Sequence, residues 1–168
     1  MTLTIEVGDT FPDLELPDHD GIARTLSELA AGDPLVLHTA RGYWCPKEQT
    51  FARSVLVPLQ GEAEVAYTRF VTVSTDPPET SRAFRAGLGA RWAFLSDAEH
   101  RYVDALGLRE GTDTVHHVYA PYAFVLTPEL RVARTWVGYW FWGRPTAEEL
   151  RRELREVTRA LRPDWDVE

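Results

Sequence analysis

The chain has 168 residues, 44% of them hydrophobic, and a formal net charge of −8. Its length supports one well-buried core and is short for two ordinary domains, so residues 1–168 are expected to form a single domain. The negative charge, without any run rich in Lys or Arg, argues against nucleic acid as a partner.

The N-terminal segment, MTLTIEVGDT, has neither a basic start nor an apolar stretch. We therefore expect no secretory signal. No window approaches the roughly 18 uninterrupted apolar residues that a membrane helix needs, so a membrane is not an expected partner. These features together predict a cytoplasmic protein.

Strand and turn signals dominate the first quarter of the chain. Residues 14–16 and 23–26 flank a D-H-D-G turn, a pattern that predicts a β-hairpin. A short helix is expected next, with Ser27 as its N-cap. Residues 34–39 form a short apolar run, which is typical of a buried central strand.

A helix is predicted from Pro46 to about residue 59. Phe51, Val55 and Leu59 recur on one face of this stretch. Proline at a first helical position is a start signal, because its missing N–H has no partner there in any case.

Periodicity predicts further alternation downstream. Strands are expected at 70–74 and 92–95, and helices from 76–79 onward and over 100–108. Residues 122–127 and 132–137 are expected to be antiparallel neighbours around a Pro-Glu turn.

The last predicted element is a helix that begins at a capping box formed by Thr146 and Glu149. Leu150, Leu154 and Val157 would face the core. The element order implies a mixed central sheet covered by helices, which is an α/β sandwich.

The lone cysteine, Cys45, excludes an internal disulfide and a multi-cysteine zinc site. It lies between a predicted strand end and a helix start, where open α/β sheets carry their chemistry. The helix N-terminus, with Arg41 and Lys47 nearby, would favour the thiolate, and Glu48 would oppose them. We expect an ionised, reachable sulfur; the alternative is a cysteine that merely packs under the sheet.

Several segments resemble one family when read together. Residues 41–48, R-G-Y-W-C-P-K-E, resemble the R-G-x-W-C-P-x-C stretch of peroxiredoxin-like redoxins in the alkyl hydroperoxide reductase/thiol-specific antioxidant family. Similar likenesses lie at G-D-T-F-P-D-L, F-L-S-D, P-Y-A-F-V-L and G-R-P-T-A-E-E-L, at residues 8–14, 94–97, 121–126 and 143–150.

This resemblance implies a thioredoxin-like, peroxiredoxin-type α/β/α sandwich with an N-terminal β-hairpin and a mixed central sheet. It also implies a thiol-dependent peroxidase of the one-cysteine type, without a cofactor or a metal. Cys45 would reduce hydrogen peroxide or an organic hydroperoxide, and an external thiol reductant would restore it.

The sequence departs from the family pattern around Cys45. His38 and Gly42 stand where P-x-x-x-T-x-x-C has its proline and threonine, and that threonine helps to hold the peroxide. Glu48 replaces the second cysteine of a C-x-x-C pair. Arg41 is the nearest substitute for the family arginine, which lies near the strand that Pro121 precedes.

Each remaining site candidate has a plainer interpretation beside the functional one. Glu48 would accept a proton or orient a water, or be a solvated first-turn carboxylate. His38 is a candidate base, but a hydrogen-bonded core histidine is the favoured interpretation. Trp44 would cover the thiol or pack as a staple.

Pro121, whose counterpart in thioredoxin-like members is cis and lies beside the cysteine, would form a wall opposite the sulfur or simply begin an edge strand. Gly42, Tyr43 and Pro46 complete the expected pocket. His116 and its neighbour His117 are interpreted as loop residues rather than as a metal site.

The aromatic segment 136–142 is too dense to be only an internal strand. Clustered exposed aromatics mark interfaces, so we expect a homodimer surface there, with a hydrophobic ligand groove as the alternative.

Two functional alternatives to the peroxidase remain open. One is a monothiol thioredoxin-like protein that handles mixed disulfides or glutathione. The other is a non-catalytic redoxin-fold protein that binds a partner through its Trp-rich surface.

Overall fold

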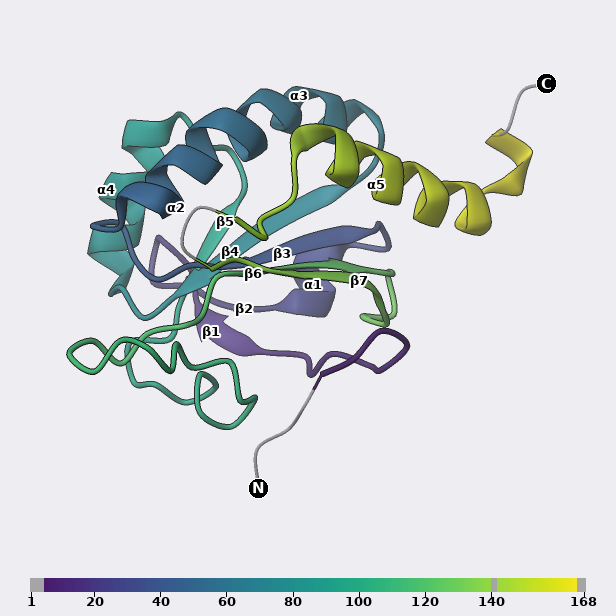
Figure 1. Cartoon of the computed structure of the whole chain (residues 1–168). Coiled ribbons are helices and arrows are strands. Elements are labelled where there is room, and N and C mark those ends of the chain that lie inside the picture. Colours follow the sequence, from purple (N-terminus) through teal and green to yellow (C-terminus); the bar gives the residue numbers. More distant parts are fainter. Residues whose placement is uncertain (1–4, 140–141, 166–168) are drawn as a thin grey trace.

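The computed structural model describes residues 5–139 and 142–165 (Figure 1). A five-stranded mixed sheet lies at its centre, in the order β5-β4-β3-β6-β7. Strands β3, β4 and β5 are parallel, and β6 and β7 run antiparallel to their neighbours. Their bounds are Leu35–Thr39 (β3), Arg69–Ser74 (β4), Ala93–Ser96 (β5), Tyr122–Leu126 (β6) and Val132–Val137 (β7).

Helices cover one face of the sheet (Figure 1). They are α2 (Pro46–Phe51), the π-helical segment Ala52–Leu56, α3 (Val57–Val65), α4 (Pro78–Leu88) and α5 (Ala147–Leu161), and a 3-10 turn, Pro163–Trp165, follows α5. The opposite face is covered by the hairpin of β1 (Glu15–Pro17) and β2 (Ala23–Thr25), by the short α1 (Leu26–Ala30) and by the loop between β5 and β6. The expected thioredoxin-like α/β sandwich with its N-terminal hairpin is confirmed.

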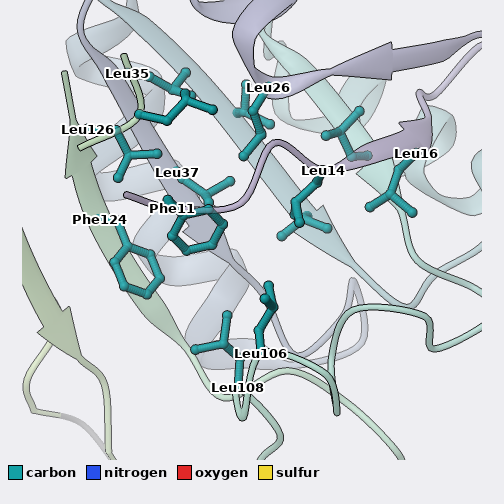
Figure 2. Close-up of a cluster of buried hydrophobic side chains, with 14 of the residues drawn as sticks. Phe11, Leu14, Leu16, Leu26, Leu35, Leu37, Leu106, Leu108, Phe124 and Leu126 are labelled. Carbon is teal, nitrogen blue, oxygen red and sulfur yellow. The ribbon is translucent and has the colours of Figure 1, made fainter. Parts of the chain in front are cut away.

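Side-chain alternation along the strands builds a core on each face. Leu35 and Leu37 of β3 point to the hairpin side, where they join Phe11, Phe124 and the other residues of Figure 2. Val36, between them, points to the helices and packs with residues such as Leu56 and Leu150. Each such fully buried side chain stabilises the fold by about 1.5–3 kcal/mol.

The helix predicted from Pro46 to about residue 59 is longer than expected. It continues to Val65 through the π-helical segment, in which the N–H of Val57 donates to the carbonyl of Ala52. Pro58 lacks an N–H, and in a regular helix its ring would clash with a carbonyl one turn earlier. The wider π turn just before Pro58 accommodates this defect, so the helix does not end there.

The helix predicted over 100–108 is wrong, because this stretch forms turns. The carboxylate of Asp97 accepts the backbone N–H groups of Arg101, Tyr102 and Val103. His100 has a φ of 56°, which is in the left-handed region. The side-chain cap therefore competes with helical hydrogen bonding.

Two predicted helix starts differ in their outcome. Ser27 is not the N-cap of α1: Thr25 caps it by accepting the N–H of Glu28, while the Ser27 hydroxyl donates to Asp13. The capping box of Thr146 at α5 is confirmed, and Leu150, Leu154 and Val157 are buried as expected.

No helix within the described residues is long and apolar enough to cross a membrane.

Candidate active site

Cys45 lies where the sequence predicts, between the carboxyl end of β3 and the start of α2. It is the N-cap residue of α2, and Pro46 takes the first helical position. The N–H of Cys45 donates to the carbonyl of Gly42 at 3.2 Å, and the N–H of Gln49 donates to the carbonyl of Cys45 at 3.1 Å. These bonds fix the thiol at the corner between the loop and the helix.

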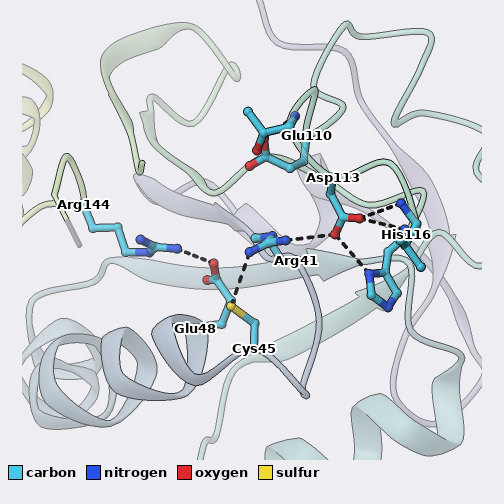
Figure 3. Close-up of polar contacts among 9 residues, drawn as sticks. Arg41, Cys45, Glu48, Glu110, Asp113, His116 and Arg144 are labelled. Atoms are coloured by element: carbon cyan, nitrogen blue, oxygen red, sulfur yellow. Dashed lines mark hydrogen bonds and ion pairs between the residues drawn. The ribbon is translucent and has the colours of Figure 1, made fainter. Parts of the chain in front are cut away.

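The expectation of a sulfur open to solvent is wrong for this conformation. Only 2% of the surface of Cys45 is exposed. The guanidinium of Arg41 lies beside the thiol, with Nη1 4.0 Å from Sγ (Figure 3). A cation at this position favours the thiolate form of a cysteine.

Asp113 holds Arg41 in place from the loop between β5 and β6. Its Oδ2 accepts a hydrogen bond of 2.9 Å from Nη2 of Arg41 (Figure 3). The backbone N–H of His116, together with the N–H of Val115, the His116 ring and Arg41, lowers the pKa of Asp113 below its usual range. The carboxylate is therefore ionised at neutral pH and pairs with the guanidinium next to the thiol.

The ring of Trp44 is packed between the side chains of His116 and Arg41. Its ring stacks on His116 with centroids 4.5 Å apart, and the Arg41 guanidinium lies 5.2 Å from the Trp44 ring centroid. Trp44 thus packs the active-site loop against the Asp113 loop. His116 was expected only as a loop residue, and Asp113 was not predicted, because the bond between Asp113 and Arg41 joins positions 72 residues apart in the sequence.

Gly42 occupies the position of the missing threonine, and the structure explains the glycine. Its φ of +141° is one that side chains rarely adopt, and a Cβ built there would lie 2.6 Å from Nε1 of Trp44. The Trp44 indole therefore fills the space that a threonine side chain would need.

Tyr43 is exposed, and its N–H donates to the carboxylate of Asp76 at 2.8 Å. Burial raises the pKa of Asp76, although the hydrogen bond from Tyr43 opposes the shift. Asp76 follows β4 and Tyr43 follows β3. The two parallel neighbouring strands therefore each contribute a segment at their carboxyl ends.

Glu48 is not a solvated first-turn carboxylate, because only 1% of its surface is exposed. Its carboxylate accepts a hydrogen bond of 2.5 Å from Nη2 of Arg144 (Figure 3). The same carboxylate bonds Nε2 of His38 at 2.9 Å. Burial alone would raise the pKa of Glu48, but the His38 hydrogen bond and the Arg144 charge hold it below its usual range. A carboxylate held in this ionised form is a poor proton acceptor.

His38 is the hydrogen-bonded core histidine that the sequence favours. It is 4% exposed and packs edge-on against Phe51, with ring centroids 5.0 Å apart. Arg144 belongs to the Gly-Arg-Pro segment, which was expected only to lead into α5, so its role beside Glu48 was not predicted. A contact between residues 48 and 144 has no local sequence signal.

Pro121 directly precedes β6, which lies between β3 and β7, so the edge-strand interpretation is wrong. No peptide bond among the described residues is cis, so Pro121 differs in this from its thioredoxin-like counterparts. The carbonyl of Pro121 accepts the N–H of Gly138 at 2.7 Å. Pro46, also expected in the pocket, lines an open groove together with Arg144 and Pro145.

The histidine pair has carboxylate partners that the sequence analysis did not foresee. His116 bonds Asp113, and Nε2 of His117 lies 2.7 Å from the carboxylate of Asp104. Within the described ranges, no group of three or more His, Cys, Asp or Glu side chains converges in a way that could hold a metal ion.

Comparison with known proteins places this geometry in a family. The AhpC/TSA family model matches residues 7–135, from the segment before the hairpin to β7. The chain belongs to the AhpC/TSA family. A Mycobacterium tuberculosis (strain CDC 1551) protein named as a peroxiredoxin is 34% identical over 110 residues, which cover 64% of this chain and 69% of the relative. The chain is therefore a peroxiredoxin-like oxidoreductase, as its motifs suggest.

Solved structures of peroxiredoxins share the fold. Peroxidoxin BcpB from Mycobacterium tuberculosis has a TM-score of 0.76 at 24% identity and aligns over 94% of this chain and 99% of its own. Reduced Prx3 from Vibrio vulnificus, in complex with hydrogen peroxide, has a TM-score of 0.74 at 21% identity, over 91% and 99% of the two chains. At these identities the likeness establishes the fold alone.

Proposed function

We propose that this protein is a thiol-dependent peroxidase of the one-cysteine type, with Cys45 as the peroxidatic residue. The observation that carries the proposal is the guanidinium of Arg41, 4.0 Å from Sγ, on the scaffold of a peroxidase family. Such a cation favours the thiolate and would stabilise negative charge on the peroxide oxygens.

The oxidative step forms one bond and breaks one. The thiolate of Cys45 attacks a peroxide oxygen, the O–O bond breaks, and the sulfur is oxidised by two electrons to a sulfenic acid. The departing oxygen takes a proton and leaves as water, or as an alcohol when the substrate is an organic hydroperoxide.

The reductive half of the cycle needs an external thiol, because the chain has no second cysteine. A thiol displaces the sulfenic oxygen as water and forms a mixed disulfide with Cys45. A second thiol then attacks that disulfide and restores the Cys45 thiolate. The external pair of thiols ends as a disulfide, which balances the two electrons given to the peroxide.

The burial of Cys45 imposes a condition on this cycle. A thiol reductant is larger than a peroxide, and it must contact a sulfur that is 2% exposed. The bond between Arg41, beside this sulfur, and Asp113 joins the cysteine loop to the loop between β5 and β6. We propose that this contact opens during the reductive half of the cycle.

The test is the intact mass of the protein after near-stoichiometric hydrogen peroxide. The proposal predicts a rapid gain of one oxygen by the wild-type chain and none by Cys45→Ser, followed by loss of that oxygen on addition of a small thiol. A glutathione adduct formed from oxidised glutathione, without any reaction with peroxide, would support the monothiol alternative instead. Inertness of Cys45 toward both reagents near neutral pH would leave a non-catalytic protein.

We also propose a homodimer, formed through the surface around the end of β7. Tyr139 is 61% exposed and Trp142 is 70% exposed, and β7 is an edge strand. Trp140 and Phe141, part of the same predicted surface, lie outside the described residues.

A cytoplasmic location remains our prediction, since a one-cysteine cycle needs the reduced thiols of that compartment.

A further inference from the structure

A slot of about 270 Å³ opens between α3 and α5, at the end of the sheet opposite Cys45. Its floor is apolar and consists of Leu59 and Ala63 of α3, Phe70 of β4 and Leu154 of α5. Phe70 lies at the amino end of β4, whereas Cys45 follows the carboxyl end of the parallel β3. The slot is therefore separate from the peroxidase site.

Side-chain contacts border the slot at two places. At one, Nε of Arg151 on α5 bonds both carboxylate oxygens of Glu62 on α3, at 2.9 and 3.0 Å. At the other, the ring of Trp165 packs against the ring of Tyr67, with centroids 5.5 Å apart. The guanidinium carbon of Arg162 lies 4.6 Å from the centroid of the Trp165 ring. The slot thus lies between two helices that run side by side (Figure 1), with an apolar floor and ionic groups at its border.

Arginines outnumber carboxylates among the residues that line the slot, although the chain as a whole carries −8. Four arginines line it against one carboxylate, Glu62, and they follow the same side of α5 and its C-cap: Arg151, Arg155, Arg159 and Arg162. Carboxylates outside the lining pair with three of them: Glu148, Glu156 and Asp33.

Arg155 is the least engaged of these cations. Its side chain is 65% exposed, and it reaches Glu62 only at 3.9 Å. Both oxygens of Glu62 already accept hydrogen bonds from Arg151. A carboxylate brought to Arg155 would gain a charge-assisted, bidentate partner next to an apolar floor.

We propose that this slot binds a single-chain anionic amphiphile, that is, a fatty-acid carboxylate. The alkyl chain lies over Phe70 and Leu154, and the carboxylate pairs with Arg155. The slot, at about 270 Å³, is long enough in this proposal for a medium-length alkyl chain such as that of decanoate. The site goes beyond the proposed peroxidase and does not depend on it.

Calorimetric titration of the full chain with decanoate tests the proposal. We expect saturable binding that Arg155→Glu weakens about tenfold, since the substitution replaces an attraction by a repulsion. Arg152→Glu is the matched control: it makes the same change of charge at an exposed position of α5 that does not line the slot. It should leave the affinity within about twofold.

A second variant and a second ligand separate the apolar and ionic parts of the site. Ala66→Phe, at an exposed position that lines the slot, should abolish decanoate binding by filling it, with the fold checked by circular dichroism. Decyltrimethylammonium, with the same chain and the opposite charge, should not bind. Equal binding of this cation, equal weakening by Arg152→Glu, or no saturable binding of decanoate would each overturn the proposal.

Discussion

At the scale of single residues, the surroundings of Cys45 show why the family pattern is altered. A side chain at position 42, where the family pattern has threonine, would clash with Trp44, and Trp44 is itself held between Arg41 and His116. The glycine at position 42 and the packing of Trp44 therefore depend on each other. Restoring the threonine alone would not restore the family site.

Gly42→Thr is expected to destabilise the fold by about 1–3 kcal/mol, because the new residue must adopt a φ near +141° and clash with Trp44. The rate of oxidation by hydrogen peroxide should not rise. Urea unfolding and peroxide-dependent mass change measure the two effects. Gly87→Thr is the control, since Gly87 lies in α4 without a neighbour within 4 Å. A faster oxidation of Gly42→Thr would show that the indole does not block this position.

Glu48 is a buried, ionised side chain that pairs with both His38 and Arg144. Removing the charge by Glu48→Gln leaves Arg144 without its partner and should reduce the free energy of unfolding by about 3 kcal/mol near neutral pH. Glu99→Gln, at a side chain that is 85% exposed, should change it little.

The effect of Glu48→Gln should also depend on pH. Because the folded protein holds the pKa of Glu48 below its ordinary value of 4.5, this group stabilises the fold above that pH. The contribution is lost as the pH falls through the lower, folded-state value. The difference in unfolding free energy between wild type and Glu48→Gln should therefore shrink on acidification, and a difference that stays constant would contradict the pairing.

At the scale of elements, local signals predicted much of the fold. Buried strands such as β3 and the capping box of α5 follow from short patterns, and both are observed. The failures occur where side chains outcompete the backbone pattern: Asp97 caps the turns that replace the predicted helix at 100–108. The pairings of Arg41 with Asp113 and of Glu48 with Arg144 join distant segments, so periodicity and spacing could not reveal them.

The loop between β5 and β6 is predicted to control access to Cys45 through Asp113. Asp113→Ala removes the acceptor that holds Arg41, so labelling of Cys45 by a bulky disulfide reagent should become about tenfold faster. Asp104→Ala, which removes a half-exposed carboxylate from the same part of the chain, is the control. Unchanged labelling in Asp113→Ala would show that another contact keeps the sulfur buried.

At the scale of the whole molecule, the edge of the sheet at β7 and the aromatics beyond it are the surface expected to join two copies. Light scattering after size exclusion should give twice the mass of one chain, and Trp142→Glu should shift the protein to the monomer. Trp165→Glu is the matched control, because it makes the same change at a 45% exposed tryptophan in the turn after α5, outside the proposed surface. A monomeric wild-type protein at high concentration would exclude this role for the surface.

Turnover, rather than a single oxidation, tests most directly whether Cys45 is a peroxidatic residue in a one-cysteine cycle. The measurement is the consumption of hydrogen peroxide in the presence of excess dithiothreitol, with wild type and Cys45→Ser compared at equal concentration. We predict sustained consumption by wild type, with one dithiothreitol oxidised for each peroxide, and only the uncatalysed rate with Cys45→Ser. Equal rates for the two proteins, or consumption by wild type that stops after one equivalent, would contradict it.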